Sequence, residues 1–211
     1  MTCPQDKPDL PEGTGSNEPQ PVPPKKRRGC LAAVAAVLAV LGILLAILLL
    51  AIGNARKEAR RIVCTSHLKI IGLAARQYTM DYNDQFPLDL QAIRDLGYIT
   101  DPLVYLCPSA SKSPEPPPAF VTNYVYIGAG LMDGGSAGYD LPIAMDDPRN
   151  HKGWHFNILF KDGHVHGFSL PRKMTSCVEV LNHLFPDLDQ SPEGHLVLEN
   201  AEKADSAGTA R

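Results

Sequence analysis

An uninterrupted apolar segment occupies residues 31–52 of this chain and reads LAAVAAVLAVLGILLAILLLAI. Its 22 residues include no charge and no proline. As a helix rising ~1.5 Å per residue it would be about 33 Å long, enough to cross a hydrocarbon core of about 30 Å. A signal peptide has a shorter apolar region of about 7–15 residues, followed by a small-residue cleavage site. We therefore expect a retained transmembrane helix over residues 30–53.

Helical periodicity continues beyond the apolar segment. Apolar or small residues recur at steps of three and four, at Ala55, Ala59, Ile62, Val63, Ser66, Ile70, Leu73, Ala74 and Tyr78. Basic residues occupy the other side, and no proline interrupts residues 31–85. This pattern predicts one helix from about residue 31 to residue 82, with its first half in lipid and its second half amphipathic. A helix this long needs a surface to lie against, so we expect a small domain to pack on its second half.

Composition limits the soluble part to one small domain. Of 211 residues, the membrane segment and two polar tails leave about 130 to form a core. We expect residues 1–29 to be a disordered, proline-rich cytoplasmic tail with a basic end, residues 54–186 to be the exported domain, and residues 187–211 to be a disordered tail. The four consecutive basic residues 25–28 favour a cytoplasmic N-terminus. A net charge of −3 argues against nucleic acid as a partner.

Short elements are expected within the domain. Asp89 begins a short helix that ends at Gly97, residues 123–127 and 141–145 form strands, and residues 174–185 form a helix. Residues 156–161 and 164–168 flank Asp162-Gly163, the dipeptide preferred in two-residue hairpin turns because both positions take φ > 0. The fold class is therefore α+β, a long N-terminal helix on a small antiparallel sheet.

The five cysteines show no C-x-x-C pair and no zinc-ribbon spacing. Cys30 lies at the membrane edge, and Cys3 lies in a tail on the opposite side of the membrane from the domain. Cys64, Cys107 and Cys177 remain for any disulfide, and we favour Cys64–Cys107.

Several motifs resemble a known family. Residues 55–87 (ARKEARRIVCTSHLKIIGLAARQYTMDYNDQFP), residues 106–109 (LCPS), and Asn150-His151 followed by NILFKDGHV at residues 157–165 occur in order. They resemble the type IV pilin-like, pseudopilin-type proteins abundant in planctomycete- and verrucomicrobium-like bacteria, which end in a His…Asp-Gly signature. The resemblance implies a pilin-like fold, a single span of the bacterial inner membrane and an extracytoplasmic C-terminal domain.

The resemblance implies a structural function. Such proteins are subunits of type II secretion or pilus-type assemblies, and pack through their N-terminal helices against their own or related helices. A prepilin peptidase would cleave between Gly29 and Cys30, although residues 30–34 (CLAAV) differ from the family's Phe-Thr-Leu-Ile-Glu start. The alternative is an uncleaved single-pass protein that presents an extracytoplasmic recognition domain. The expected partners are the lipid bilayer and other pilin-like subunits.

The most chemically suggestive cluster contains four histidines, His151, His155, His164 and His166. His164 and His166 lie two apart, so they share one face of a strand and could bind a metal together. The alternative, which we favour, is that they are polar side chains on an exposed hairpin. No serine or cysteine lies in a nucleophile motif, so we expect neither an enzyme nor a cofactor.

Overall fold

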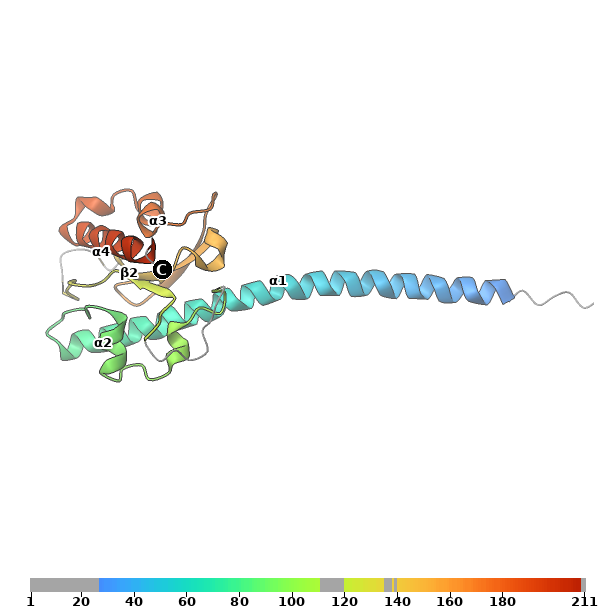
Figure 1. The fold of residues 1–211 in the computed structure, drawn as a ribbon, viewed down its shortest axis with the longest axis horizontal. Helices are drawn as coiled ribbons and strands as arrows, with labels where there is room; N and C mark the ends of the chain where they lie inside the picture. Colours follow the sequence, from blue (N-terminus) through green and yellow to red (C-terminus); the bar gives the residue numbers. More distant parts are fainter. Residues whose placement is uncertain (1–26, 111–119, 135–137, 139, 210–211) are drawn as a thin grey trace, which may run out of the picture. The chain divides into compact units, whose positions relative to one another are not determined.

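The computed structural model describes residues 27–110, 120–134, 138 and 140–209. The chain divides into two units, Met1–Leu48 and Leu49–Arg211. Helix α1 (Arg27–Asp81) confirms the predicted long helix (Figure 1). In the first unit, every α1 side chain described, from Ala33 onward, is exposed. Helix α1 is long and apolar enough to cross a membrane, and none of its most apolar stretch is buried. These properties are compatible with a single-pass membrane protein.

The second unit is built on a four-stranded antiparallel sheet in the order β1-β2-β3-β4 (Figure 1). Its strands are β1 (Tyr124–Tyr126), β2 (Pro142–Asp146), β3 (His155–Phe160) and β4 (Val165–Ser169). All three neighbouring pairs are antiparallel. The sheet confirms the strands predicted from sequence, and with α1 it gives the α+β layout of a long helix on a small sheet, which is consistent with a pilin-like arrangement.

The β3–β4 hairpin is present, but its turn differs from the prediction. Phe160 N donates to His164 O, and Gly163 N donates to Phe160 O, each at 2.9 Å. Gly163 has φ +91°, whereas Asp162 is not among the residues with positive φ. The connection is thus a three-residue loop, a turn followed by a left-handed glycine, and not a two-residue turn. This loop needs only one residue with positive φ, and glycine takes it at little cost.

Helix α1 packs on the sheet mainly through residues outside the predicted face, of which Ala74 alone is buried. The fully buried residues of this face are Cys64, Leu68, Ile71 and Ala75. Gly72 lies so close to β3 that a Cβ there would be 2.6 Å from Leu159 Cδ1. In contrast, Ile62 and Leu73, both on the face expected to pack, are 63% and 71% exposed. The prediction failed because this half of α1 carries apolar residues on two faces, and periodicity alone does not say which one meets the sheet.

The predicted disordered tail at residues 187–211 is wrong for its described part. Residues 192–209 form helix α4 (Pro192–Thr209), which follows a short 3₁₀ turn, η3 (Leu188–Gln190). Val197 and Ala201 of α4 are fully buried, and Asn200 Nδ2 donates to the carbonyls of Ile127 and Ala129 just after β1. In the second unit, the sheet lies between α1 and α4 (Figure 1). The domain therefore extends well beyond residue 186.

The remaining helices agree with the sequence. Helix α2 (Leu90–Asp95) begins after Asp89, whose Oδ1 accepts a hydrogen bond from Ala92 N at 2.8 Å, and Gly97 follows with φ +82°. Helix α3 (Cys177–Leu184) lies within the predicted helix at 174–185. Two 3₁₀ turns complete the unit, η1 (Pro102–Tyr105) and η2 (Asn150–Gly153). Both matter for function because they precede or contain residues of the site described next.

Candidate functional site

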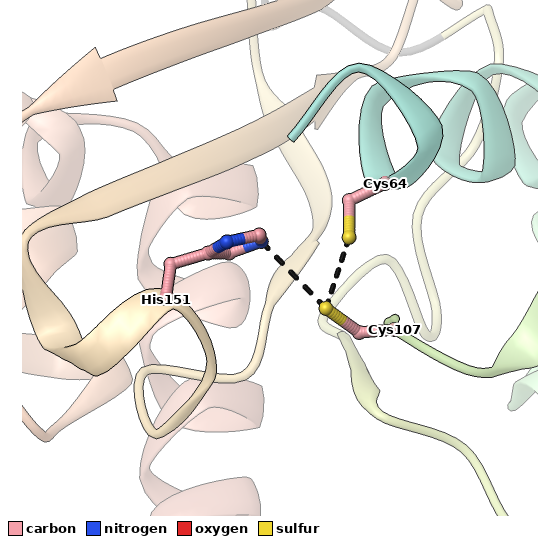
Figure 2. A group of neighbouring side chains, drawn as sticks. All are labelled: Cys64, Cys107 and His151. Atoms are coloured by element: carbon pink, nitrogen blue, oxygen red, sulfur yellow. Dashed lines mark hydrogen bonds between the residues drawn. The ribbon is translucent and has the colours of Figure 1, made fainter. Parts of the chain in front are cut away.

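Two cysteines distant in sequence meet between α1 and the segment after η1. Cys64 Sγ and Cys107 Sγ lie 2.9 Å apart, and both residues are completely buried (Figure 2). The backbone of Cys107 is held by Asn123, because the Cys107 N–H donates a hydrogen bond to Asn123 Oδ1 at 3.0 Å. Both cysteines carry free thiols here. The structure thus brings together the pair favoured from sequence, and the disulfide itself stays a prediction.

A histidine from η2 completes the cluster. His151 Nε2 lies 3.6 Å from Cys107 Sγ, and Figure 2 shows the ring directed at the two sulfurs. Three successive residues, His151, Lys152 and Gly153, have positive φ of 48°, 61° and 74°. Left-handed backbone is unfavourable for residues with a Cβ and is often retained at functional sites. At Gly153 a Cβ would lie 2.5 Å from Met174 O, so only glycine fits.

A buried carboxylate lies behind the histidine. Asp146 of β2 is fully buried, and its Oδ2 lies 3.4 Å from His151 Nε2. The same oxygen accepts hydrogen bonds from Asn157 N at 3.0 Å and Asn157 Nδ2 at 2.7 Å. A buried charge needs such partners to offset its lost hydration. Asp146 is therefore held in place as the counter-charge for His151.

The cluster stabilises one thiolate and one imidazolium. A hydrogen bond from the Cys64 thiol, the largest influence, and another from His151 hold the pKa of Cys107 below its usual range despite burial. The same sulfur contact, together with burial, raises the pKa of Cys64. Burial opposes the charged form of His151, but hydrogen bonds to Asp146 and Cys107 outweigh it and raise its pKa to about 9. The opposite directions of the two shifts favour Cys107 over Cys64 as the sulfur that gives up its proton.

The distance between the two sulfurs lies about midway between that of a disulfide and that of two thiolates on one metal ion. A disulfide needs an S–S distance of about 2.05 Å, so the sulfurs at 2.9 Å must approach by about 0.9 Å. Two sulfurs on one tetrahedral zinc, each bonded at about 2.3 Å, lie about 3.8 Å apart. The ligand atoms of Cys64, Cys107 and His151 do lie within 4.8 Å of one another. Binding a metal would require the sulfurs to separate by about 0.9 Å, as far as they must approach to form a disulfide.

The cluster also does not present a nucleophile to a substrate. The side chain of Cys107 is completely buried. In a catalytic triad one imidazole nitrogen faces the nucleophile and the other faces the carboxylate. Here both Cys107 and Asp146 face the same atom, His151 Nε2. His151 and Asp146 therefore place a positive and a negative group beside the two sulfurs, but they are not arranged as the proton relay of a triad.

The four histidines singled out from sequence do not form one site. His155 of β3 has its ring centroid 5.9 Å from that of His151. His164 is exposed and binds the Asp162 carboxylate through Nδ1 at 2.5 Å, and His166 is exposed beside Phe168. Of these four histidines, only His151 belongs to a set of three or more converging potential metal ligands among residues 27–110, 120–134, 138 and 140–209. The other members of that set are Cys64 and Cys107.

The proposed processing position falls at the start of α1. Gly29 and Cys30 lie in α1, but the described side chains begin at Ala33. Most of the proline-rich tail, residues 1–26, lies outside the described residues.

Sequence reasoning missed the partnership of His151 with the two cysteines. Both residues did lie in motifs that carry the family resemblance, Cys107 in Leu-Cys-Pro-Ser and His151 in Asn-His. Nothing in their spacing indicated contact, since 44 residues separate Cys107 from His151. In comparisons with protein-family models, curated proteins and solved structures, nothing matches the chain.

Proposed function

We propose that this protein is a membrane-anchored, pseudopilin-like structural subunit of a secretion or pilus-type apparatus. In this proposal α1 anchors the chain in the bacterial inner membrane, and the sheet-containing unit lies on the extracytoplasmic side. The role is one of assembly and involves no catalytic step. Support comes from the motif resemblance, the exposed apolar segment of α1 and a small sheet domain packed on the same helix.

The observation that carries the proposal is an apolar stripe on the soluble half of α1. Ile62, Leu73 and Met80 are 63%, 71% and 83% exposed, and they share one side of the helix because 11 and 7 residues separate them. This side is opposite to the face that buries Cys64 and Leu68 against the sheet. Exposed apolar patches of this kind mark interaction surfaces. We propose that α1 of another subunit packs against this stripe. The contact between the two helices would then continue from the apolar segment of α1 into its soluble half.

Site-specific photo-crosslinking in native membranes tests the proposal. A photo-reactive residue in place of Leu73 should give a ladder of adducts containing two or more chains. The same residue in place of Leu88, which is 75% exposed but lies outside α1, should give monomers. Leu73→Glu should abolish the ladder and change the free energy of unfolding by no more than about 0.5 kcal/mol, as is usual for surface substitutions. Only monomers from position 73 would overturn the assembly role and favour the alternative recognition domain.

The intact mass of the protein extracted from its membrane gives a second test. A chain that begins at Cys30 means that a peptidase accepts the Gly29–Cys30 bond, as assembly of a pseudopilin requires. A chain that retains its first residues means a permanent anchor and contradicts the processed-subunit form of the proposal.

A further inference from the structure

A pocket separate from the cysteine pair opens beside the first soluble turns of α1. It has a volume of about 440 Å³. Its lining combines residues of α1 with residues of η2 and the start of the hairpin, namely Lys57, Arg60, Arg61, His151, Lys152 and Trp154. Cationic groups from two distant parts of the sequence therefore converge on one space.

The pocket carries an excess of positive charge. Arg61 forms an ion pair with Glu58 at 3.2 Å, and His151 faces Asp146 at 3.4 Å. The other three cations, Lys57, Arg60 and Lys152, have no ion-pair partner among the residues that the structure describes. Unpaired cations that surround a pocket attract an anion, and a phosphate group fits both the charge and the number of donors.

The backbone of η2 is held in an unusual conformation that places Lys152 at this pocket. Lys152 and the preceding His151 both have left-handed φ, at 61° and 48°. A residue with a Cβ avoids this region unless its surroundings impose it. Trp154, two residues on, is 49% exposed at the same pocket. A loop that is strained and exposes its largest apolar side chain has the features of a binding loop and not those of a simple connection.

The position of the pocket along α1 identifies the source of the anion. Lys57 and Arg60 follow the last apolar residue, Ile52, by five and eight residues, or about 7.5 and 12 Å of helix. The headgroup layer of a bilayer extends about 5–8 Å beyond the hydrocarbon core. Helical side chains lean toward the N-terminus, so these cations lean back toward the apolar segment. Trp154 lines the same pocket, and tryptophan, like tyrosine, is enriched at membrane–water interfaces.

We propose that this pocket binds the phosphate of an anionic phospholipid in the bilayer that α1 crosses. Lys57, Arg60 and Lys152 contact the phosphate, and Trp154 inserts among the headgroups. The η2 loop thereby becomes a second attachment of the domain to the membrane, in addition to α1. The inference rests on the membrane location in the proposed function, and the experiment separates the two.

Trp154 is the only tryptophan in the chain, so tryptophan fluorescence, excited at wavelengths that tyrosine does not absorb, reports on this pocket. The full chain is placed in nanodiscs of zwitterionic lipid, with or without anionic phospholipid, and with brominated lipids as quenchers. Anionic discs should shift the emission to shorter wavelength and allow quenching, and high salt should reverse both effects. A chain that fails to enter nanodiscs would contradict the proposed function. A chain that enters, but whose Trp154 is quenched equally in both lipids or in neither, would overturn the pocket assignment alone.

Matched lysine variants test the charge requirement. Lys152→Gln and, separately, Lys57→Gln should each weaken the apparent affinity for anionic lipid about fivefold, as expected for one lysine at an anionic surface. Lys69→Gln, an exposed lysine further along α1, should behave as the wild type. Equal effects of all three variants would refute a specific pocket. The same blue shift produced in zwitterionic discs by inorganic phosphate alone would show that free phosphate is the ligand and would overturn the assignment to lipid.

Discussion

Oxidation of the Cys64–Cys107 pair should be the largest single contribution to the stability of the domain. The two residues are 43 positions apart. In the chain-entropy model, closing a loop of that length stabilises the folded state by about 4 kcal/mol at 25 °C. This corresponds to about 700-fold in the folding equilibrium, and domains are stable by only about 5–15 kcal/mol in total. We therefore expect the reduced protein to be much closer to unfolding.

Urea unfolding of the full chain in mild detergent measures this difference. With a slope of about 1–3 kcal/mol per molar urea, a loss of about 4 kcal/mol moves the midpoint down by about 1.3–4 M when reductant is added. The double variant Cys64→Ser, Cys107→Ser should unfold at a low midpoint that reductant does not change. Cys177→Ser removes the other buried thiol of the domain and should keep the full response to reductant.

Mass spectrometry provides the decisive result. Peptides containing Cys64 and Cys107 should be joined when the oxidised protein is digested without reductant. If both thiols are alkylated in denaturant without reductant, and reductant leaves the midpoint unchanged, the reasoning is refuted. Stoichiometric zinc released together with those two thiols would instead assign the cluster to a metal.

Three further outcomes are expected. Burial lowers the pKa of His151, but hydrogen bonds to a carboxylate and a thiol raise it to about 9. The contribution of the His151 charge to the stability of the folded state is therefore complete below about pH 6.5 and is lost as the pH rises through 9. In reductant, the lowered pKa of Cys107 acts in the opposite direction over the same range, because the unfolded thiol binds a proton that the folded one has lost. The wild-type urea midpoint should therefore fall with rising pH relative to that of His151→Gln. Gly153→Ala should lower the free energy of unfolding by several kcal/mol more than Gly97→Ala. Both glycines have positive φ, but only at position 153 would a Cβ lie against a backbone carbonyl. Calorimetry of the two variants measures the difference. Asp205→Ala should cost about 1–3 kcal/mol in urea unfolding, since the carboxylate accepts three hydrogen bonds at the start of α3; an unchanged midpoint would contradict that role.

Much of the fold was accessible from local sequence patterns. The apolar segment and the absence of proline predicted α1, and Asp89 and Gly97 predicted both ends of α2. The hairpin was found from Asp162-Gly163, although the details of its turn depended on which residue takes positive φ. In these places the local preference and the final structure agree, so no tertiary information was needed.

Other parts depended on tertiary contacts that periodicity does not encode. Helix α4 packs through Gly194, Val197 and Ala201, of which the glycine and the alanine give only a weak apolar signal. A Cβ at Gly194 would lie 1.8 Å from Leu188 O. The buried face of α1 was wrongly predicted because a second apolar face competes with it. His151 reaches Cys107 only through a left-handed loop, and sequence patterns do not reveal such loops. The errors thus lie where shape and not hydrophobicity determines the contact.

The capping of α3 by α4 has a consequence for the order of folding during synthesis. The Asp205 carboxylate accepts hydrogen bonds from Ser176 Oγ and Cys177 N, although 29 positions separate Ser176 from Asp205. At about 5–20 residues per second, the ribosome adds Asp205 about 1.5–6 s after Ser176. During that interval the first turn of α3 lacks these acceptors, and the sheet face that α4 covers is open. Until α4 is added, a nascent domain therefore leaves this face open to proteases and chaperones.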